Sequence, residues 1–366
     1  MNILHIANIR NRPQSGVVNV VPKYVKHQSK HANTALFNLD DHEPEDLVDG
    51  NYGLLFKANE YPNGVVDLPP PFNRPDLIVF HDVYWPAFIG MAKYCKATNI
   101  PYIVTPHGSL TDTAQRRKRL KKFLGNMLIF NKFVKGASAI HFLSQSEKDQ
   151  TSRFSDTPYF ICSNGMETRP RLKTSFNSDK LSLVYVGRLQ YIIKGIDRIL
   201  ETVNSIQDEM RSLDICVSIF GPTQDGAEEK IKKVMQRYGI EDLVAVRPGL
   251  FGEEKVQEIV SHDCFIQFSR TEGQPLGIIE AMDLGMPCIV TQGTTFHAIA
   301  HDNNAGIPVS DSPHEIARTI LDVRKGGYDL GRISANASHF TKSAYEWKQV
   351  ARRMIHEYEK IKTQLR

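Results

Sequence analysis

Residues 270–282 are the part of the sequence best suited to chemistry, because two carboxylates there bracket a stretch with glycines and a proline. Glu272 lies in the expected loop, and Glu280 lies in the first turns of the helix expected to follow. The first N–H groups of a helix lack partners within it and the helix dipole makes this end positive, so phosphate oxygens bind there readily. A glutamate near the start of a helix also stabilises it, by ~0.3–1 kcal/mol, because its charge complements the dipole. That simpler explanation would cover Glu280 but not Glu272.

Two basic residues follow the apolar run 181–186, which is expected to be a strand. Arg188 and Lys194 would lie in the loop beyond it, where an arginine can bind two phosphate oxygens and a lysine supplies a point charge. The alternative is a pair of solvated surface cations. Arg171 and Lys173, upstream of this strand, are interpreted as ordinary surface charges.

Two histidines lie at the ends of expected strands. His81 is the last residue of one strand, and His107 follows another. A histidine at a strand end is commonly a hydrogen-bonded packing residue, but the Pro-His-Gly context makes His107 the better catalytic candidate. Gly16 precedes an expected helix and would let the backbone approach a ligand closely, although a glycine there can also be only a helix cap.

Six of the seven residues from 116 to 122 are basic, with apolar residues following at helical spacing. One interpretation is a surface helix with a charged outer face. Another is attraction to anionic lipid, worth ~1 kcal/mol per basic residue. Nucleic acid is a third option, but no aromatic stacking residues interleave with the cluster, so we expect contact with the inner face of a membrane. The basic residues are Arg116, Arg117, Lys118, Arg119, Lys121 and Lys122.

The elements that would position these residues follow an alternating pattern of strand-like and helix-like segments, typical of βα units with parallel sheets. The first set of expected strands comprises residues 2–7, 34–39, 77–81, 102–105, 139–143 and 159–162. The second set comprises residues 181–186, 214–220, 243–247, 264–268, 288–291 and 306–309. Two consecutive sets predict two doubly wound domains, whose ligands bind beyond the carboxyl ends of the strands, in a cleft where the domains face each other.

Helical segments are expected between these strands, and residues 167–179, which include Pro170, are expected to be a linker. An amphipathic helix is predicted at residues 343–365. The other expected helices are residues 19–30, 86–98, 114–135, 146–154, 195–206, 227–238, 254–261, 276–284 and 313–324.

Composition excludes several classes of protein. The 366 residues suit two domains of roughly 100–200 residues, and 41% hydrophobic content allows real cores. No apolar run approaches the ~18 residues that span a bilayer, the first residues lack the features of a secretory signal, and a net charge of +4 does not by itself indicate nucleic acid. Five cysteines without a Cys-x-x-Cys pair argue against a disulfide scaffold or zinc site. A cytoplasmic protein is therefore expected.

The run from Glu272 to Met282 resembles the E-G-x-P-x-x-x-x-E-A-M signature of retaining GT-B glycosyltransferases of family 4. Other segments resemble landmarks of the family in the expected order. They are Thr105-Pro106-His107-Gly108, Ser163-Asn164-Gly165, Val186-Gly187-Arg188-Leu189 with Lys194-Gly195, and Phe220-Gly221. The resemblance implies a GT-B fold in which residues 1–168, joined by the terminal helix 343–366, form the acceptor domain. Residues 180–342 would form the nucleotide-sugar donor domain, with the terminal helix crossing back to the first domain.

The resemblance also implies roles for individual residues. Arg188 and Lys194 would bind the donor diphosphate, Glu280 the ribose hydroxyls and Glu272 the transferred sugar, while His107 would line the sugar's reacting face. The remaining donor-binding candidates are Gly16, Gly221, Gln274, Pro275, Leu276 and Gly277. The family usually has an apolar residue at the position of Gln274. This departure puts the donor selectivity in question.

Family chemistry retains the anomeric configuration and needs no protein nucleophile. No Asp-x-Asp motif is present, so no metal and no obligatory cofactor are expected beyond a UDP- or GDP-sugar donor. The acceptor would be a saccharide or a lipid-linked saccharide, in the synthesis of surface polysaccharide. The alternatives are a catalytically silent sugar-nucleotide sensor, a sugar-nucleotide epimerase, whose acid/base groups cannot be located in the sequence, and a phosphorylase, which would need a longer chain. Nucleic-acid binding is a further alternative, and it is not expected.

Overall fold

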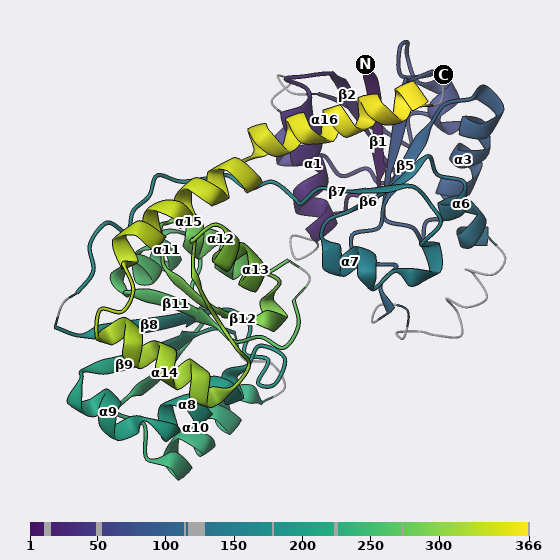
Figure 1. Cartoon of the computed structure of the whole chain (residues 1–366). Coiled ribbons are helices and arrows are strands. Elements are labelled where there is room, and N and C mark those ends of the chain that lie inside the picture. The colour runs from purple at the N-terminus through teal and green to yellow at the C-terminus, as the bar shows by residue number, and fades with distance from the viewer. Residues whose placement is uncertain are drawn as a thin grey trace. The chain divides into compact units, whose positions relative to one another are not determined.

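The chain divides into two compact units. The structure is a computed structural model that describes residues 1–10, 16–48, 53–112, 115, 129–177, 179–222, 226–272 and 274–364. Unit 1 comprises Met1–Met166 and Tyr345–Arg366, and unit 2 comprises Glu167–Ala344 (Figure 1). Residues 167–179, expected to be a linker, belong to unit 2, where the backbone N–H groups of Leu172 and Lys173 donate to the carbonyl of Leu284.

Unit 1 is built on a parallel sheet in the order β3-β2-β1-β4-β5-β6-β7. Its strands are β1 (Asn2–Ala7), β2 (Asn33–Asn38), β3 (Leu54–Lys57), β4 (Leu77–His81), β5 (Tyr102–Thr105), β6 (Ala139–Phe142) and β7 (Tyr159–Ile161). Six of them match expected strands to within a residue or two. The edge strand β3 was not expected, and Leu54 at its start is 51% exposed.

Helices cover both faces of this sheet. They are α1 (Gly16–Gln28), α2 (Glu45–Val48), α3 (Ala87–Thr98), α6 (Asn131–Lys135), α7 (Gln145–Asp149) and α16 (Trp347–Gln364), with 3₁₀ turns at Gly64–Asp67 and Ser152–Phe154. Of the helix expected at residues 114–135, only α6 and the turn of residues 129–130 that leads into it fall in a described stretch. Residues 113–114 and 116–128 lie outside the described residues.

The last helix, α16, packs against α1, as Figure 1 shows in yellow and purple. Trp347, Met354 and Tyr358 are each at most 2% exposed and share a hydrophobic core with Ile3 and Val21. The expected return of the terminal helix to the first domain is confirmed. It begins at Trp347 rather than at residue 343, because a separate helix ends just before it.

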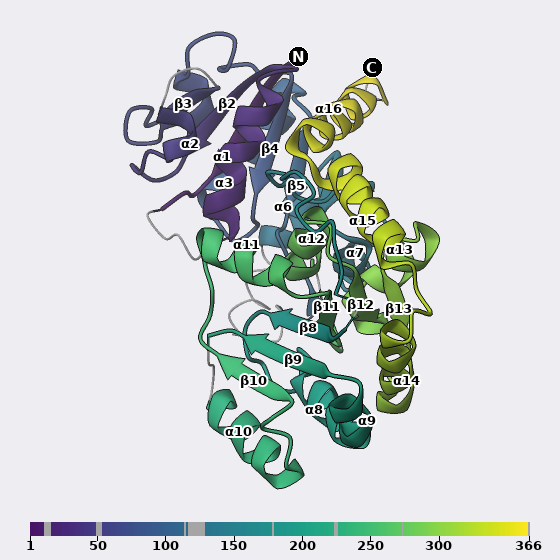
Figure 2. The same cartoon turned by 90° about the vertical axis from the view of Figure 1, so that its left-hand side faces the viewer.

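Unit 2 is built on a second parallel sheet, in the order β10-β9-β8-β11-β12-β13. Its strands are β8 (Leu181–Val186), β9 (Ile215–Phe220), β10 (Val244–Arg247), β11 (Cys264–Gln267), β12 (Cys288–Thr291) and β13 (Ile307–Val309). Figure 2 shows β8, β9 and β10 side by side at one end of this sheet. All six strands were expected, because each is a short and mainly apolar run, and all but the edge strand β10 are largely buried in the sheet.

The helices of unit 2 are α8 (Ile196–Ser205), α9 (Gln207–Ser212), α10 (Ala227–Tyr238), α11 (Gly252–Ser261), α12 (Leu276–Asp283), α13 (Phe296–Asp302), α14 (Pro313–Arg324) and α15 (Leu330–Tyr345), with a 3₁₀ turn at Gln292–Thr294. Three of these, α9, α13 and α15, were not expected. The α15 segment is rich in serine, asparagine and other weak helix formers, and α9 and α13 are too short to show a helical period. Within the described parts of the chain, no helix is long and apolar enough to cross a membrane.

Candidate active site

The loops that follow β8 and β11 lie at the point where the strand order of unit 2 reverses. From β8 the chain runs through β9 to β10 on one side, and β11 then returns to pair with β8 on the other. Ligands of doubly wound sheets bind beyond the carboxyl ends of the strands at such a point. Residues 187–194 follow β8 and residues 268–275 follow β11, so the two candidate motifs share this edge.

Glu272 is the centre of a buried polar network. Its Oε1 accepts hydrogen bonds from Lys194 Nζ at 2.6 Å, from Gln267 Nε2 at 2.7 Å and from Ser269 Oγ at 2.8 Å. The side chains of Lys194 and Glu272 are only 15% and 8% exposed, so this ion pair is shielded from solvent. Its second carboxylate oxygen, Oε2, takes part in none of these three bonds. The structure therefore links the two motifs that the sequence analysis had treated separately.

A second ion pair fastens the same loops together. Arg270 donates to both carboxylate oxygens of Asp197, at 2.8 and 2.6 Å, and to the carbonyl of Ile192 at 2.5 Å. Asp197 is in the first turn of α8, and the backbone N–H of Arg270 donates to the carbonyl of Ile193. This bidentate contact holds the loop that carries Lys194 against the loop that carries Glu272. Sequence reasoning missed it, because Arg270 and Asp197 are 73 positions apart.

Two glycines allow the strand ends to approach closely. Gly195 has φ +70°, and a Cβ there would lie 2.1 Å from the carbonyl oxygen of Phe268. A Cβ on Gly221 would lie 1.8 Å from the carbonyl oxygen of Gly187. Neither position could hold a side chain without moving the backbone, so both glycines are required for packing. The expected contact of Gly221 with the donor stays a prediction.

Helix α12 starts at this edge and carries no acidic residue in its first turn. Pro275 precedes it, Leu276 at its start is 58% exposed, and a Cβ on Gly277 would lie 3.2 Å from the carbonyl oxygen of Val186, at the end of β8. Glu280 is one turn further on, and its Oε2 accepts a hydrogen bond from Lys255 Nζ of α11. Lys255 was not singled out in the sequence, where it is one of several charged residues in an amphipathic helix.

The two cations expected at the diphosphate differ in their surroundings. Arg188 is exposed, and the Tyr185 hydroxyl donates to its carbonyl oxygen at 3.0 Å, which fixes the backbone of the turn. Lys194 is half-buried and bonded to Glu272.

The interpretation of Lys173 as a surface charge was wrong. Its ammonium is buried 3.5 Å from Asp263, whose carboxylate also accepts hydrogen bonds from Ser182.

In unit 1, His107 follows β5 in a turn of unusual backbone conformation. His107 has φ +50° and Gly108 has φ +80°. The buried carboxylate of Glu147, in α7, accepts hydrogen bonds from the backbone N–H groups of Gly108 at 2.5 Å and Leu143 at 2.7 Å. Burial raises the pKa of Glu147, and the two backbone bonds oppose that rise. A left-handed conformation of a non-glycine residue persists only where its surroundings hold it, and Glu147 does so here.

His107 is the last of three histidines that are hydrogen-bonded one to the next in unit 1. Its Nε2 is 3.0 Å from Nδ1 of His81, and Nε2 of His81 is 2.9 Å from Nδ1 of His5. These strands, β1, β4 and β5, are neighbours, so the histidines form a row that runs from His5 within β1 to the turn after β5. Burial lowers the pKa of His5 to about 4 and that of His107 to about 3. His81 is thus part of the same arrangement as His107, whereas the sequence favoured His107 alone.

The remaining sequence candidates fall outside these two groups. Gly16 is the first residue of α1, and the chain just before it, residues 11–15, is not described. The expected membrane contact at residues 116–122 lies wholly outside the described residues and stays a prediction. In all, the structure brings Arg188, Lys194, Glu272, Glu280 and the start of α12 to one edge of unit 2 and places His107 with His81 in unit 1.

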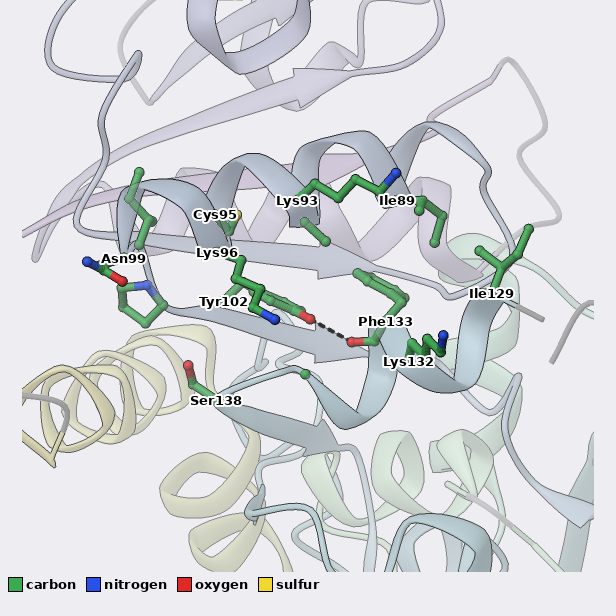
Figure 3. Close-up of a pocket in the computed structure, with 14 residues that line it drawn as sticks. Ile89, Lys93, Cys95, Lys96, Asn99, Tyr102, Ile129, Lys132, Phe133 and Ser138 are labelled. Carbon is green, nitrogen blue, oxygen red and sulfur yellow. Dashed lines mark hydrogen bonds between the residues drawn. The ribbon is translucent and has the colours of Figure 1, made fainter. Parts of the chain in front are cut away.

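Unit 1 has a cavity of about 920 Å³ that is separate from the row of histidines (Figure 3). It lies between α3 and α6, beside the hydrogen bond from the Tyr102 hydroxyl to the carbonyl of Phe133, with Lys93 and Lys132 among its lining residues. Tyr102 begins β5 and Ser138 precedes β6, so the cavity is at the amino ends of the strands. His107 is beyond the opposite ends, and the cavity is therefore not part of the candidate site.

Comparison with known proteins identifies the family. A sequence model described as Glycosyl transferases group 1 matches residues 180–325, and one described as Glycosyltransferase Family 4 matches residues 67–169. Mannosylfructose-phosphate synthase of Agrobacterium fabrum is 22% identical over 74% of this chain and 66% of that protein. Alpha-monoglucosyldiacylglycerol synthase of Acholeplasma laidlawii is 24% identical over 73% of this chain and 71% of that protein.

Solved structures share the architecture. The lipopolysaccharide outer core galactosyltransferase WaaB, in its apo form, superposes with a TM-score of 0.70 at 16% identity and covers 98% of this chain and 100% of its own. Anabaena Alr3699/HepE in complex with UDP superposes with a TM-score of 0.67 at 15% identity, over 98% of this chain and 100% of its own. Two doubly wound sheets with this topology define the GT-B class of fold. The chain belongs to the group 1 glycosyltransferases, family 4.

Proposed function

We propose that the protein is a retaining glycosyltransferase that moves a sugar from a nucleotide-sugar donor to a saccharide or lipid-linked saccharide acceptor. We assign the donor to unit 2 and the acceptor to unit 1. The reaction would serve the synthesis of surface glycans. The names of the relatives support a role in surface glycan synthesis, since they include a synthase of a glucosylated lipid and a lipopolysaccharide galactosyltransferase.

The observation that carries the proposal is the edge of unit 2 where Arg188, Lys194 and the amino end of α12 converge. A nucleoside diphosphate carries two charged phosphates, and each needs fixed cations or dipoles. Arg188 is exposed with its backbone held, so its guanidinium is available to a ligand, and Lys194 adds a second charge. As the nucleoside diphosphate departs, negative charge grows on it, and the same groups stabilise that charge in the transition state.

The other candidates receive roles around this anion. Glu272 is oriented through Oε1, which leaves Oε2 for a hydroxyl of the transferred sugar. Glu280, held by Lys255, would accept hydrogen bonds from the ribose hydroxyls. His107 of unit 1 would contact the transferred sugar. Its lowered pKa keeps the imidazole neutral at physiological pH, so it acts as a hydrogen-bonding group and not as a cation.

In the proposed reaction the bond between the anomeric carbon and the diphosphate oxygen breaks, and the acceptor oxygen bonds to the same carbon on the same face. The proton of the acceptor hydroxyl passes to the departing phosphate oxygen. No protein nucleophile is required, so Glu272 orients the sugar and stabilises charge without forming a covalent adduct.

Release of nucleoside diphosphate from UDP- and GDP-sugars, with and without oligosaccharide acceptors, tests the proposal, and NMR of the product gives the anomeric configuration. We expect Glu280→Ala chiefly to weaken nucleotide binding and Arg188→Ala chiefly to lower turnover. Glu253→Gln, which alters an exposed ion pair with Arg169 in the same unit, is the matched control. Parental transfer rates in both site variants would refute the site, and nucleotide binding without turnover would indicate a sensor.

A further inference from the structure

Three histidines in unit 1 form a row that ends at His107. The ring centroids of His5 and His81 are 5.2 Å apart, and those of His81 and His107 are 5.3 Å apart. His5 and His81 are at most 1% exposed, and the Tyr24 ring stacks on His81 from another side at 5.5 Å. Hydrogen bonds of 2.9 and 3.0 Å join the rings edge to edge. The row therefore connects the interior of the unit to the turn beyond β5.

All three imidazoles are neutral near pH 7. Burial lowers the pKa of His5 to about 4, that of His107 to about 3 and that of His81 well below its ordinary value. A neutral imidazole has one nitrogen that donates and one that accepts. Each bond of the row needs one of each, so the row as a whole can take only two arrangements of its protons, which run in opposite directions.

Gln28, at the end of α1, selects between these two arrangements. Its Oε1 is 3.0 Å from Nε2 of His5, and its Nε2 donates to the Met354 sulfur at 3.3 Å. A thioether sulfur can only accept, which orients the amide with its oxygen toward His5. Nε2 of His5 must then carry the proton, and its Nδ1 accepts from Nε2 of His81. By the same rule Nδ1 of His81 accepts from Nε2 of His107.

We propose that His81 and His5 are positioning residues that hold His107 in the tautomer with the proton on Nε2, so that its bare Nδ1 accepts a hydrogen bond from the substrate. This inference rests on the role proposed above for His107. The polarity starts at Gln28 and passes through two buried rings. Nδ1 of His107 is therefore fixed as an acceptor before any substrate arrives, which makes a hydroxyl proton the group that it recognises.

Two substitutions of His81 separate hydrogen bonding from packing. His81→Phe keeps an aromatic ring in the row but removes both nitrogens. His81→Gln keeps one acceptor and one donor, which can take the proton of His107 Nε2 and give one to Nδ1 of His5. His141→Phe is the matched control. His141 is also buried, with its pKa lowered to about 4, but it bonds to Thr105 and to the carbonyl of Cys162 and lies outside the row.

The first readout is the tautomer of His107, measured by nitrogen-15 NMR of the full chain labelled at histidine. A His107→Asn variant assigns the signal by its loss. We expect a protonated Nε2 and a bare Nδ1 in the parent, in His81→Gln and in His141→Phe, and a mixture of tautomers in His81→Phe. A protonated Nδ1 in the parent would overturn the proposal even if no variant folded. So would an unchanged His107 signal in His81→Phe.

The second readout is sugar transfer. Partners that orient a metal-ligating imidazole are worth about 10- to 100-fold in activity or metal affinity, and we take the same range for His107. We expect His81→Phe to lower kcat by about this factor with little change in the donor KM, and His81→Gln to restore most of it. Equal losses in His81→Phe and His141→Phe would reduce His81 to a packing residue. If the parent transfers no sugar, the proposed function fails, whereas the NMR result still decides whether the row sets the tautomer.

Discussion

Replacing Glu272 with glutamine removes the negative charge beside Lys194 while keeping the shape of the side chain. Oε1 of Glu272 accepts three hydrogen bonds, and the one from Lys194 is charged on both sides. The amide oxygen can still accept, but the ammonium of Lys194, only 15% exposed, loses its ion-pair partner. A hydrogen bond to a charged group is worth about 1.5–3 kcal/mol, and an unpaired buried charge costs more. Because some solvent reaches Lys194, we expect a loss of about 2–3 kcal/mol in the stability of unit 2.

Calorimetric unfolding measures this loss as a shift in the midpoint of the transition of unit 2. A loss of 2–3 kcal/mol corresponds to a decrease of about 4–12 °C for a unit of this size. The control is Glu253→Gln, whose ion pair with Arg169 has the same length of 2.6 Å but whose side chain is 69% exposed. Exposed pairs contribute about 0.2–1 kcal/mol, so its shift should be much smaller.

A double-mutant cycle completes this test. With Lys194→Met already present, Glu272→Gln should cost clearly less than it does alone, because the charge pair is absent in both proteins. Additive effects, or a Glu272→Gln shift no larger than that of Glu253→Gln, would show that the pair does not hold the two loops together.

Three further predictions follow from other contacts of the site. Arg270→Lys loses the bidentate bond to Asp197 and should raise the donor KM while lowering stability by about 1–2 kcal/mol; an unchanged KM would mean that the loop of Lys194 does not need this support. Lys255→Met should lower stability by less than about 1 kcal/mol, because the pair is partly exposed, yet weaken nucleotide binding about fivefold in calorimetric titration, since Glu280 loses its orientation. Unit 1 should lose stability as the pH falls below about 6.5, because the pKa values of His5, His107 and His141 are lower in the fold than in the unfolded chain, where protons then bind. Each such histidine contributes a slope of about 1.4 kcal/mol per pH unit until its folded pKa is reached, and urea unfolding from pH 7.5 to 4.5 measures it, with His141→Phe expected to flatten the slope.

The regular part of the fold was predictable from local pattern. Runs such as 181–186 and 288–291 are short, apolar and bounded by polar loops, so their burial in a parallel sheet follows from composition. The strand β3 and the helices α13 and α15 were not predictable in this way. They depend on pairing or packing with distant parts of the chain, and their own sequences carry weak signals.

In the candidate site, too, the local motifs were predictable and the long-range contacts were not. The types and order of Arg188, Lys194, Glu272 and Glu280 indicated an anion site, because each motif is local. The contacts that hold these residues are not local. Lys194 and Glu272 are separated by 78 positions and His5 and His81 by 76, and no short pattern records which charged or polar residue across the unit will face another. For the same reason the buried pair of Lys173 with Asp263 was mistaken for a surface charge.

The most direct test of the central claim is a crystal structure of the protein soaked with UDP or GDP, whichever raises the unfolding temperature more. We predict that the diphosphate binds at the amino end of α12, with oxygens within hydrogen-bond distance of Arg188 and Lys194 and the ribose hydroxyls on Glu280. A diphosphate bound elsewhere, such as in the cavity beside Tyr102, or a soak that leaves this edge of unit 2 without nucleotide at saturating concentration, would contradict the account.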